Sequence, residues 1–84
     1  MAWSLKWTPG AVRDLGRLQA KEQERIRAKL RESLKNPARF YVKLTGEDTW
    51  RLRVGDRRVI VLILFVGETI QVQSIGHRST VYGR

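Results

Sequence analysis

Residues 50–61 read WRLRVGDRRVIV and give the clearest indication of secondary structure in the sequence. Apolar and basic side chains alternate on both sides of the Gly-Asp dipeptide at 55–56, which is typical of a two-residue hairpin turn. Such a turn places Arg53 opposite Arg58, and Arg51 then shares their face. The stretch therefore predicts two antiparallel strands with arginines on one face and apolar side chains on the other.

The residues around this hairpin predict a single α+β domain over residues 1–84. The periodicity predicts strands over 2–7, 50–54, 57–65 and 69–75, helices over 9–19 and 22–35, and a loop over 36–48. Thr8-Pro9 is a typical helix start, and Asn36-Pro37 ends the second helix. We expect an N-terminal strand, an antiparallel helical hairpin and a three-stranded antiparallel meander, which together complete a four-stranded, mostly antiparallel sheet.

The two faces of the predicted sheet differ in character. A second two-residue turn at Gly67-Glu68 would place Leu62 opposite Gln73 and Arg58 opposite His77. One face would then collect Arg51, Arg53, Arg58, Gln73 and His77. The other face would form the core, with Trp50, Leu52, Val54, Val59, Val61, Ile63, Phe65, Ile70 and Val72 packed against Val12, Leu15, Leu18, Ile26, Leu30 and Leu34.

Composition limits the chemistry that is open to this chain. The 84 residues include 17 Lys+Arg and 8 Asp+Glu, a formal charge of +9, so nucleic acid, an anionic surface or an acidic protein is the expected partner. With no cysteine and one histidine, the sequence offers no disulfide, thiolate nucleophile or multi-histidine metal site, and we expect no cofactor. The longest apolar run, residues 59–66, is far shorter than the about 20 residues that span a bilayer, and no signal peptide is evident, so we expect a cytoplasmic protein.

The arginine face has two interpretations. It is either the solvated side of a one-sided sheet or a binding site for an anion, which would relieve the repulsion between like charges on neighbouring strands. Tyr82 favours single-stranded RNA, because a base can stack on its ring, although it could instead anchor the tail to the sheet. His77 is a candidate for proton transfer or a turn residue that bonds to backbone, since imidazole is the side chain that ordinarily titrates near neutral pH.

Two segments resemble a known family. Residues 50–61 and the ending Ile75-Gly-His-Arg-Ser-Thr-Val-Tyr82 resemble the RelE/ParE superfamily of bacterial and archaeal type II toxins, and the order of elements fits over essentially the whole chain. RelE-type members are ribosome-dependent endoribonucleases that cut mRNA in the ribosomal A site and are inhibited by a cognate antitoxin. ParE-type members share the fold and instead poison DNA gyrase.

The resemblance implies roles for individual residues. Arg51 and Arg53 stand where RelE-type toxins carry a basic pair, and with Lys43 and Arg57 they form the expected RNA- or ribosome-binding set. Arg58 and Arg78 match the family's arginines on the third strand and after the fourth. Tyr82 matches the tyrosine that stacks on a base. Elementary chemistry agrees, because arginines bind phosphate bidentately and are poor general bases, which leaves His77 and Tyr82 as candidates for proton transfer. The expected catalytic set is therefore Arg58, Arg78, Tyr82 and His77.

Three functions fit these residues. The leading hypothesis is a RelE-type mRNA interferase whose partners are an acidic antitoxin, the ribosome and mRNA, with no membrane involved and a toxin–antitoxin hetero-oligomer as the possible assembly. The alternatives are a non-catalytic ParE-like toxin that acts on gyrase and an RNA-binding module that does not cleave.

Overall fold

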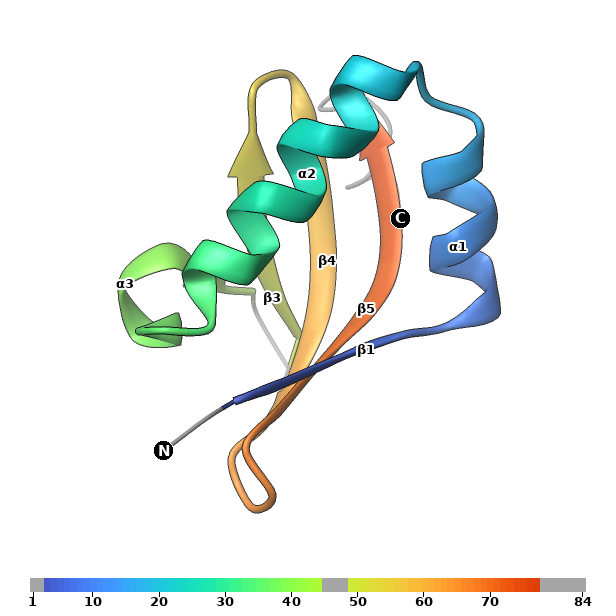
Figure 1. The fold of residues 1–84 in the computed structure, drawn as a ribbon. Helices are drawn as coiled ribbons and strands as arrows, with labels where there is room; N and C mark the ends of the chain where they lie inside the picture. Colours follow the sequence, from blue (N-terminus) through green and yellow to red (C-terminus); the bar gives the residue numbers. More distant parts are fainter. Residues whose placement is uncertain (1–2, 45–48, 78–84) are drawn as a thin grey trace.

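The computed structural model describes residues 3–44 and 49–77 of the chain. In these residues helices cover one face of a five-stranded sheet (Figure 1). The elements follow in the order β1 Ser4–Trp7, α1 Pro9–Gly16, α2 Ala20–Ser33, α3 Pro37–Phe40, β2 Val42–Lys43, β3 Thr49–Val54, β4 Arg57–Leu64 and β5 Thr69–His77. The predicted α+β class is confirmed.

The sheet has one more strand than the sequence predicts. Its order is β1-β5-β4-β3-β2, with β1 parallel to β5 and every other pair antiparallel. The expected four-stranded sheet is wrong because Pro37–Phe40 and Val42–Lys43, within the predicted loop, form regular structure. After the short helix α3, Val42 pairs with Arg51 and Lys43 pairs with Trp50, which adds β2 as an edge strand.

The helices begin close to where the sequence predicts but pack differently. Thr8 caps α1, because its hydroxyl oxygen accepts a hydrogen bond from the Ala11 N–H at 3.1 Å. The helix ends at Gly16 and not at residue 19. α1 and α2 run in opposite directions but diverge, with α1 against β5 and α2 against β3 (Figure 1). The predicted antiparallel hairpin is therefore replaced by two helices that each cover their own part of the sheet.

The core lies between these helices and the sheet. Leu52, Val59, Val61, Ile70 and Val72 from the strands are fully buried with Ile26 and Leu30 from α2 and Ala11 from α1. Two predicted core residues are wrong. Val12 is 55% exposed because α1 turns Ala11 and Leu15 inward in its place. Phe65 is 61% exposed because it lies beyond the end of β4.

A buried polar contact joins α2 to the segment after α3. The Ser33 hydroxyl donates to the Leu30 carbonyl at 2.6 Å and lies 2.9 Å from the Tyr41 hydroxyl. Burial raises the pKa of Tyr41 to about 12, and the hydrogen bond with Ser33 opposes part of that rise. No helix within residues 3–44 and 49–77 is long and apolar enough to cross a bilayer.

Candidate nucleic-acid interface

The β3–β4 hairpin places three of its four arginines on the sheet face that points away from the helices. Gly55 adopts φ +61°, and the turn is the predicted two-residue loop, so Arg53 pairs with Arg58 and Arg51 pairs with Ile60. Directly opposed residues of an antiparallel pair point to the same side of the sheet. The predicted register of this hairpin is confirmed, and we call the sheet face that carries Arg51, Arg53 and Arg58 the outer face.

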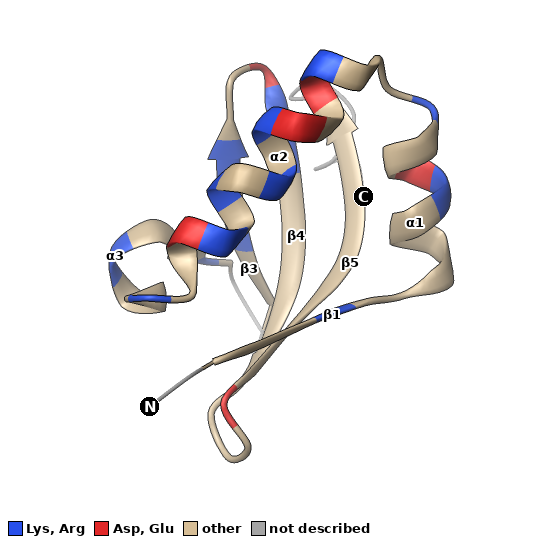
Figure 2. Ribbon diagram, in the orientation of Figure 1, with Lys and Arg blue, Asp and Glu red and all other residues tan. Residues whose placement is uncertain are grey.

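In the described part of the chain, the helices carry both acidic and basic side chains, whereas the strands carry no acidic ones. The acidic residues lie on α1, on α2 and in the two turns at the ends of β4 (Figure 2). The outer face carries Arg51, Arg53 and Arg58 from β3 and β4, and Lys6 lies on the same face at its β1 edge. Arg53 is exposed, whereas Arg51 and Arg58 are half-buried. Guanidinium groups are suited to bind phosphate through paired N–H donors.

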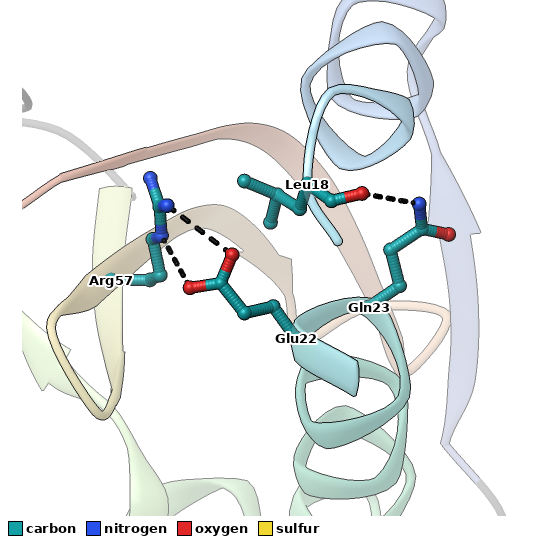
Figure 3. Close-up of polar contacts among 4 residues, drawn as sticks. All are labelled: Leu18, Glu22, Gln23 and Arg57. Atoms are coloured by element: carbon teal, nitrogen blue, oxygen red, sulfur yellow. Dashed lines mark hydrogen bonds and ion pairs between the residues drawn. The ribbon is translucent and has the colours of Figure 1, made fainter. Parts of the chain in front are cut away.

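Arg57 lies on the other side of the sheet. Its Nε is 3.3 Å from Oε2 of Glu22 and its Nη2 is 3.3 Å from Oε1, a bidentate ion pair with α2 (Figure 3). Gln23 follows Glu22 on α2, and its side-chain amide donates to the Leu18 carbonyl at 2.9 Å (Figure 3). Arg57 therefore ties the hairpin to the start of α2, and it does not share the outer face with Arg58.

His77 also leaves the predicted face. The turn between β4 and β5 is a four-residue loop, and a β-bulge shifts the register again between Ile60 and Val61. The predicted pairing of Arg58 with His77 is wrong, because Arg58 pairs with Gly76 and His77 pairs with Arg57. Register therefore assigns the exposed His77 side chain to the side of Arg57.

Lys43 is separated from the outer face as well. It pairs with Trp50, which is on the helix side opposite Val61, and its Nζ lies 5.8 Å from the centroid of the Trp50 ring. The remaining predicted site residues, Arg78 and Tyr82, lie outside the described residues. Within the described ranges, no cluster of three or more histidine and carboxylate side chains could hold a metal ion.

Residues 5–82 match the family described as the ParE toxin of the type II toxin–antitoxin system parDE. The chain belongs to this family. It is thus a toxin of the RelE/ParE superfamily, as the resemblance of residues 50–61 and 75–82 implies. A comparison with curated protein sequences gives no match.

The fold is similar to solved toxins of this superfamily. A chain of the archaeal RelE–RelB complex from Pyrococcus horikoshii OT3 is 24% identical with a TM-score of 0.82, over 96% of this chain and 100% of that one. The isolated RelE toxin of E. coli is 25% identical with a TM-score of 0.78, over 96% and 92%. The YoeB/ParE toxin from Agrobacterium tumefaciens is 21% identical with a TM-score of 0.73, over 88% and 96%.

The outer face of this RelE/ParE-type toxin contains the predicted Gln73 and two residues that were not predicted there, Lys6 and Gln71. Lys6 pairs with Gln71 on the β1–β5 ladder, and Gln71 pairs with Leu62 on the β5–β4 ladder, so all three share this face. The Gln73 amide donates to Oε1 of Gln71 at 3.1 Å, which places Gln73 beside them. Alternation within the sequence of β5 indicates that Gln71 and Gln73 share a face, but only the pairing of β1 with β5 brings Lys6 to it.

Proposed function

We propose that this toxin is a ribosome-dependent endoribonuclease that cleaves mRNA in the A site. The observation that carries the proposal is the outer face, where Arg51, Arg53 and Arg58 lie together on β3 and β4. The likeness to the RelE toxin of E. coli supports the same activity. An arginine-rich sheet face of this kind suits a single-stranded RNA better than a duplex groove, because it is broad and no helix of residues 3–44 and 49–77 projects from it.

The chemistry required of such a site is modest. The ribose 2′-OH attacks the adjacent phosphorus, the bond from phosphorus to the 5′-oxygen breaks, and the products are a 2′,3′-cyclic phosphate and a 5′-hydroxyl. One proton leaves the 2′-OH and one reaches the 5′-oxygen. Arg58 and Arg78 would stabilise the charge that builds on the phosphate oxygens, while Arg51 and Arg53 hold the RNA. His77 and Tyr82 are the candidates for the proton transfers.

Substitution of Arg58 tests this proposal. Arg58→Ala should lower the rate of mRNA cleavage on programmed ribosomes by about 10²–10³, the usual loss when one transition-state donor is removed, and should weaken ribosome binding much less. Arg27→Ala is the matched control, because Arg27 is an exposed arginine on α2. A folded Arg58→Ala protein that cleaves at the wild-type rate contradicts the assignment.

A gyrase-directed toxin is the second candidate. The observation that favours it is the family match itself, since that family is described as the ParE toxin of parDE. The two functions separate in purified systems. Inhibition of gyrase supercoiling by a wild-type protein that leaves ribosome-bound mRNA intact would establish the second function and reject the first.

We further propose that a cognate acidic antitoxin binds this toxin. Several structurally similar proteins are toxins in complex with an antitoxin, among them the RelE–RelB complexes of Pyrococcus horikoshii and Methanococcus jannaschii. The formal charge of +9 favours an acidic partner. The product of the adjacent gene should co-purify with the toxin and inhibit it, and a product that does neither contradicts the proposal.

A further inference from the structure

Two glutamines on β5 form a hydrogen-bonded pair on the outer face. Nε2 of Gln73 donates to Oε1 of Gln71 at 3.1 Å, and both side chains are half-buried. Gln71 lies opposite Leu62 on β4. The hydrogen bond uses one of the two amide hydrogens of Gln73 and one lone pair of Gln71. The carbonyl oxygen and the second N–H of Gln73 are not used in this hydrogen bond, and Gln71 fixes the orientation of the Gln73 amide.

A β-bulge presents Gln73 at this point. Val61 pairs with Val72 and Ile60 pairs with Ser74, so Gln73 is the extra residue of β5. Bulges turn side chains in new directions and are common beside functional sites. In a regular ladder Gln73 would pair with a residue of β4, whereas here its backbone has no β4 partner in the register.

Thr8, which caps α1, and Asp14 on α1 contact the backbone of β5 on both sides of this bulge. The Thr8 hydroxyl lies 3.0 Å from the Val72 carbonyl oxygen and 3.3 Å from that of Gln73. The Asp14 carboxylate accepts a hydrogen bond from the Ile75 N–H at 2.9 Å. These contacts fix the strand on either side of Gln73, which is the kind of support that keeps a recognition residue in place before its ligand arrives.

The glutamine pair lies between cations. Lys6 on β1 pairs with Gln71 on one side. On the other side, β4 contributes the half-buried Ile60 and then Arg58, and Arg51 on β3 lies opposite Ile60. Strands are about 4.8 Å apart, so Arg51 is roughly 10 Å across the sheet from the bulge. Positive charge thus flanks a centre of amide and apolar groups, an order that suits phosphates at the edges and one base in the middle.

We propose that the Gln71–Gln73 pair is a base-recognition subsite that binds an adenine of the RNA through its Hoogsteen edge. The inference rests on the proposed ribonuclease function and adds a sequence preference to it. An amide that offers a donor beside an acceptor matches N7 and the N6 amino group of adenine, whereas guanine presents two acceptors there. The apolar surface of Ile60 and Leu62 supports the face of the base.

The test uses mRNAs that carry adenosine or 7-deazaadenosine at each position around the cleavage site on programmed ribosomes. Wild-type toxin should cleave the RNA with 7-deazaadenosine at one position roughly 5–150-fold more slowly, because the analogue lacks N7 and leaves the half-buried Gln73 N–H without its acceptor. Gln73→Ala should cleave both RNAs at the same reduced rate. Gln73→Glu, which keeps the shape of the side chain but not its donor, should behave in the same way if Gln73→Ala does not fold.

Gln19→Ala is the matched control, because Gln19 is an exposed glutamine at the start of α2 and should keep the full effect of the analogue. A folded Gln73→Ala or Gln73→Glu toxin that still discriminates against 7-deazaadenosine overturns the subsite and leaves the ribonuclease function intact. Unchanged base preference with weakened antitoxin binding also overturns it and assigns the pair to a protein interface. A wild-type toxin that leaves all these RNAs uncut overturns the ribonuclease function and the subsite together.

Discussion

Val61 and Val12 show that the contribution of a valine to stability depends on whether its face of the strand or helix points into the core. Val61 is fully buried on the helix-facing side of β4, and Val12 is 55% exposed on α1. Val61→Asp should unfold the domain, because an unpaired carboxylate would be buried at a cost of several kcal/mol. Val12→Asp should change the free energy of unfolding by less than about 0.5 kcal/mol. Urea denaturation followed by circular dichroism compares the two, and a stably folded Val61→Asp protein would contradict the described core.

Tyr41 provides a pH-dependent test of burial at a single residue. Its pKa in the folded protein is about 12, above the ordinary value of 10.0, because burial disfavours the phenolate. The folded state therefore holds this proton more tightly than the unfolded chain. The contribution of this proton to the free energy of unfolding is fully present below pH 10.0 and is lost as the pH rises towards 12.

Tyr41→Phe should remove this part of the alkaline loss of stability. Urea unfolding of wild type and Tyr41→Phe between these two pH values measures it, since lysine titration affects both proteins equally. At neutral pH the variant should lose about 0.5–1.5 kcal/mol with the Ser33 hydrogen bond. Parallel pH profiles for the two proteins would show that Tyr41 does not titrate with a raised pKa in the folded state.

At the level of elements, the β3–β4 hairpin could be predicted from sequence and the β4–β5 hairpin only in part. A tight Gly-Asp turn fixes the first register. In the second, Gly67 at φ +99° and Glu68 at φ +47° belong to a longer loop that shifts the pairing by two residues, from Leu62–Gln73 to Leu62–Gln71, and preserves the faces. The bulge at Ile60/Val61 then reverses the faces beyond it, which is why the expected position of His77 is wrong.

The bulge could not be predicted from the sequence, because the residues that contact it are distant in the chain. Thr8, which caps α1, and Asp14 on α1 contact the bulge, and the alternation of residues within β5 does not indicate these contacts. The edge strand β2 escapes for another reason, since two residues are too few to show a period. The three arginines of the outer face were predictable because all of them depend on the first hairpin alone.

Asp14 tests the support of the bulge. Asp14→Ala should leave the Ile75 N–H without its side-chain acceptor and lower the free energy of unfolding by about 1–3 kcal/mol, with faster hydrogen exchange of the Ile75 amide. Asp14→Asn keeps an oxygen that can accept this hydrogen bond and should retain most of the stability. Equal stability and equal exchange in wild type and Asp14→Ala would show that α1 does not hold the bulge through this contact.

At the level of the whole molecule, the surfaces of the sheet and the helices differ in charge. Acidic side chains are confined to helices and turns in the described ranges, where Glu22 and Arg57 join α2 to the hairpin (Figures 2 and 3). The outer face keeps Lys6 and three arginines on its strands. For a phosphate chain, the position of the cations therefore matters more than the net charge of +9, because cations that line one continuous face attract the chain most strongly.

The salt dependence of RNA binding measures this directly. Each phosphate contact with a single strand contributes about −0.7 to the slope of log K against log salt, because one condensed counterion is released. Arg53→Ala removes an exposed cation of the outer face and should make the slope shallower by about 0.7, whereas Arg27→Ala on α2 should leave it unchanged. Fluorescence anisotropy with a short single-stranded RNA from about 50 to about 200 mM salt provides the slopes. If both variants shift the slope equally, binding follows net charge and not the outer face, and the placement of RNA along β3 and β4 is wrong.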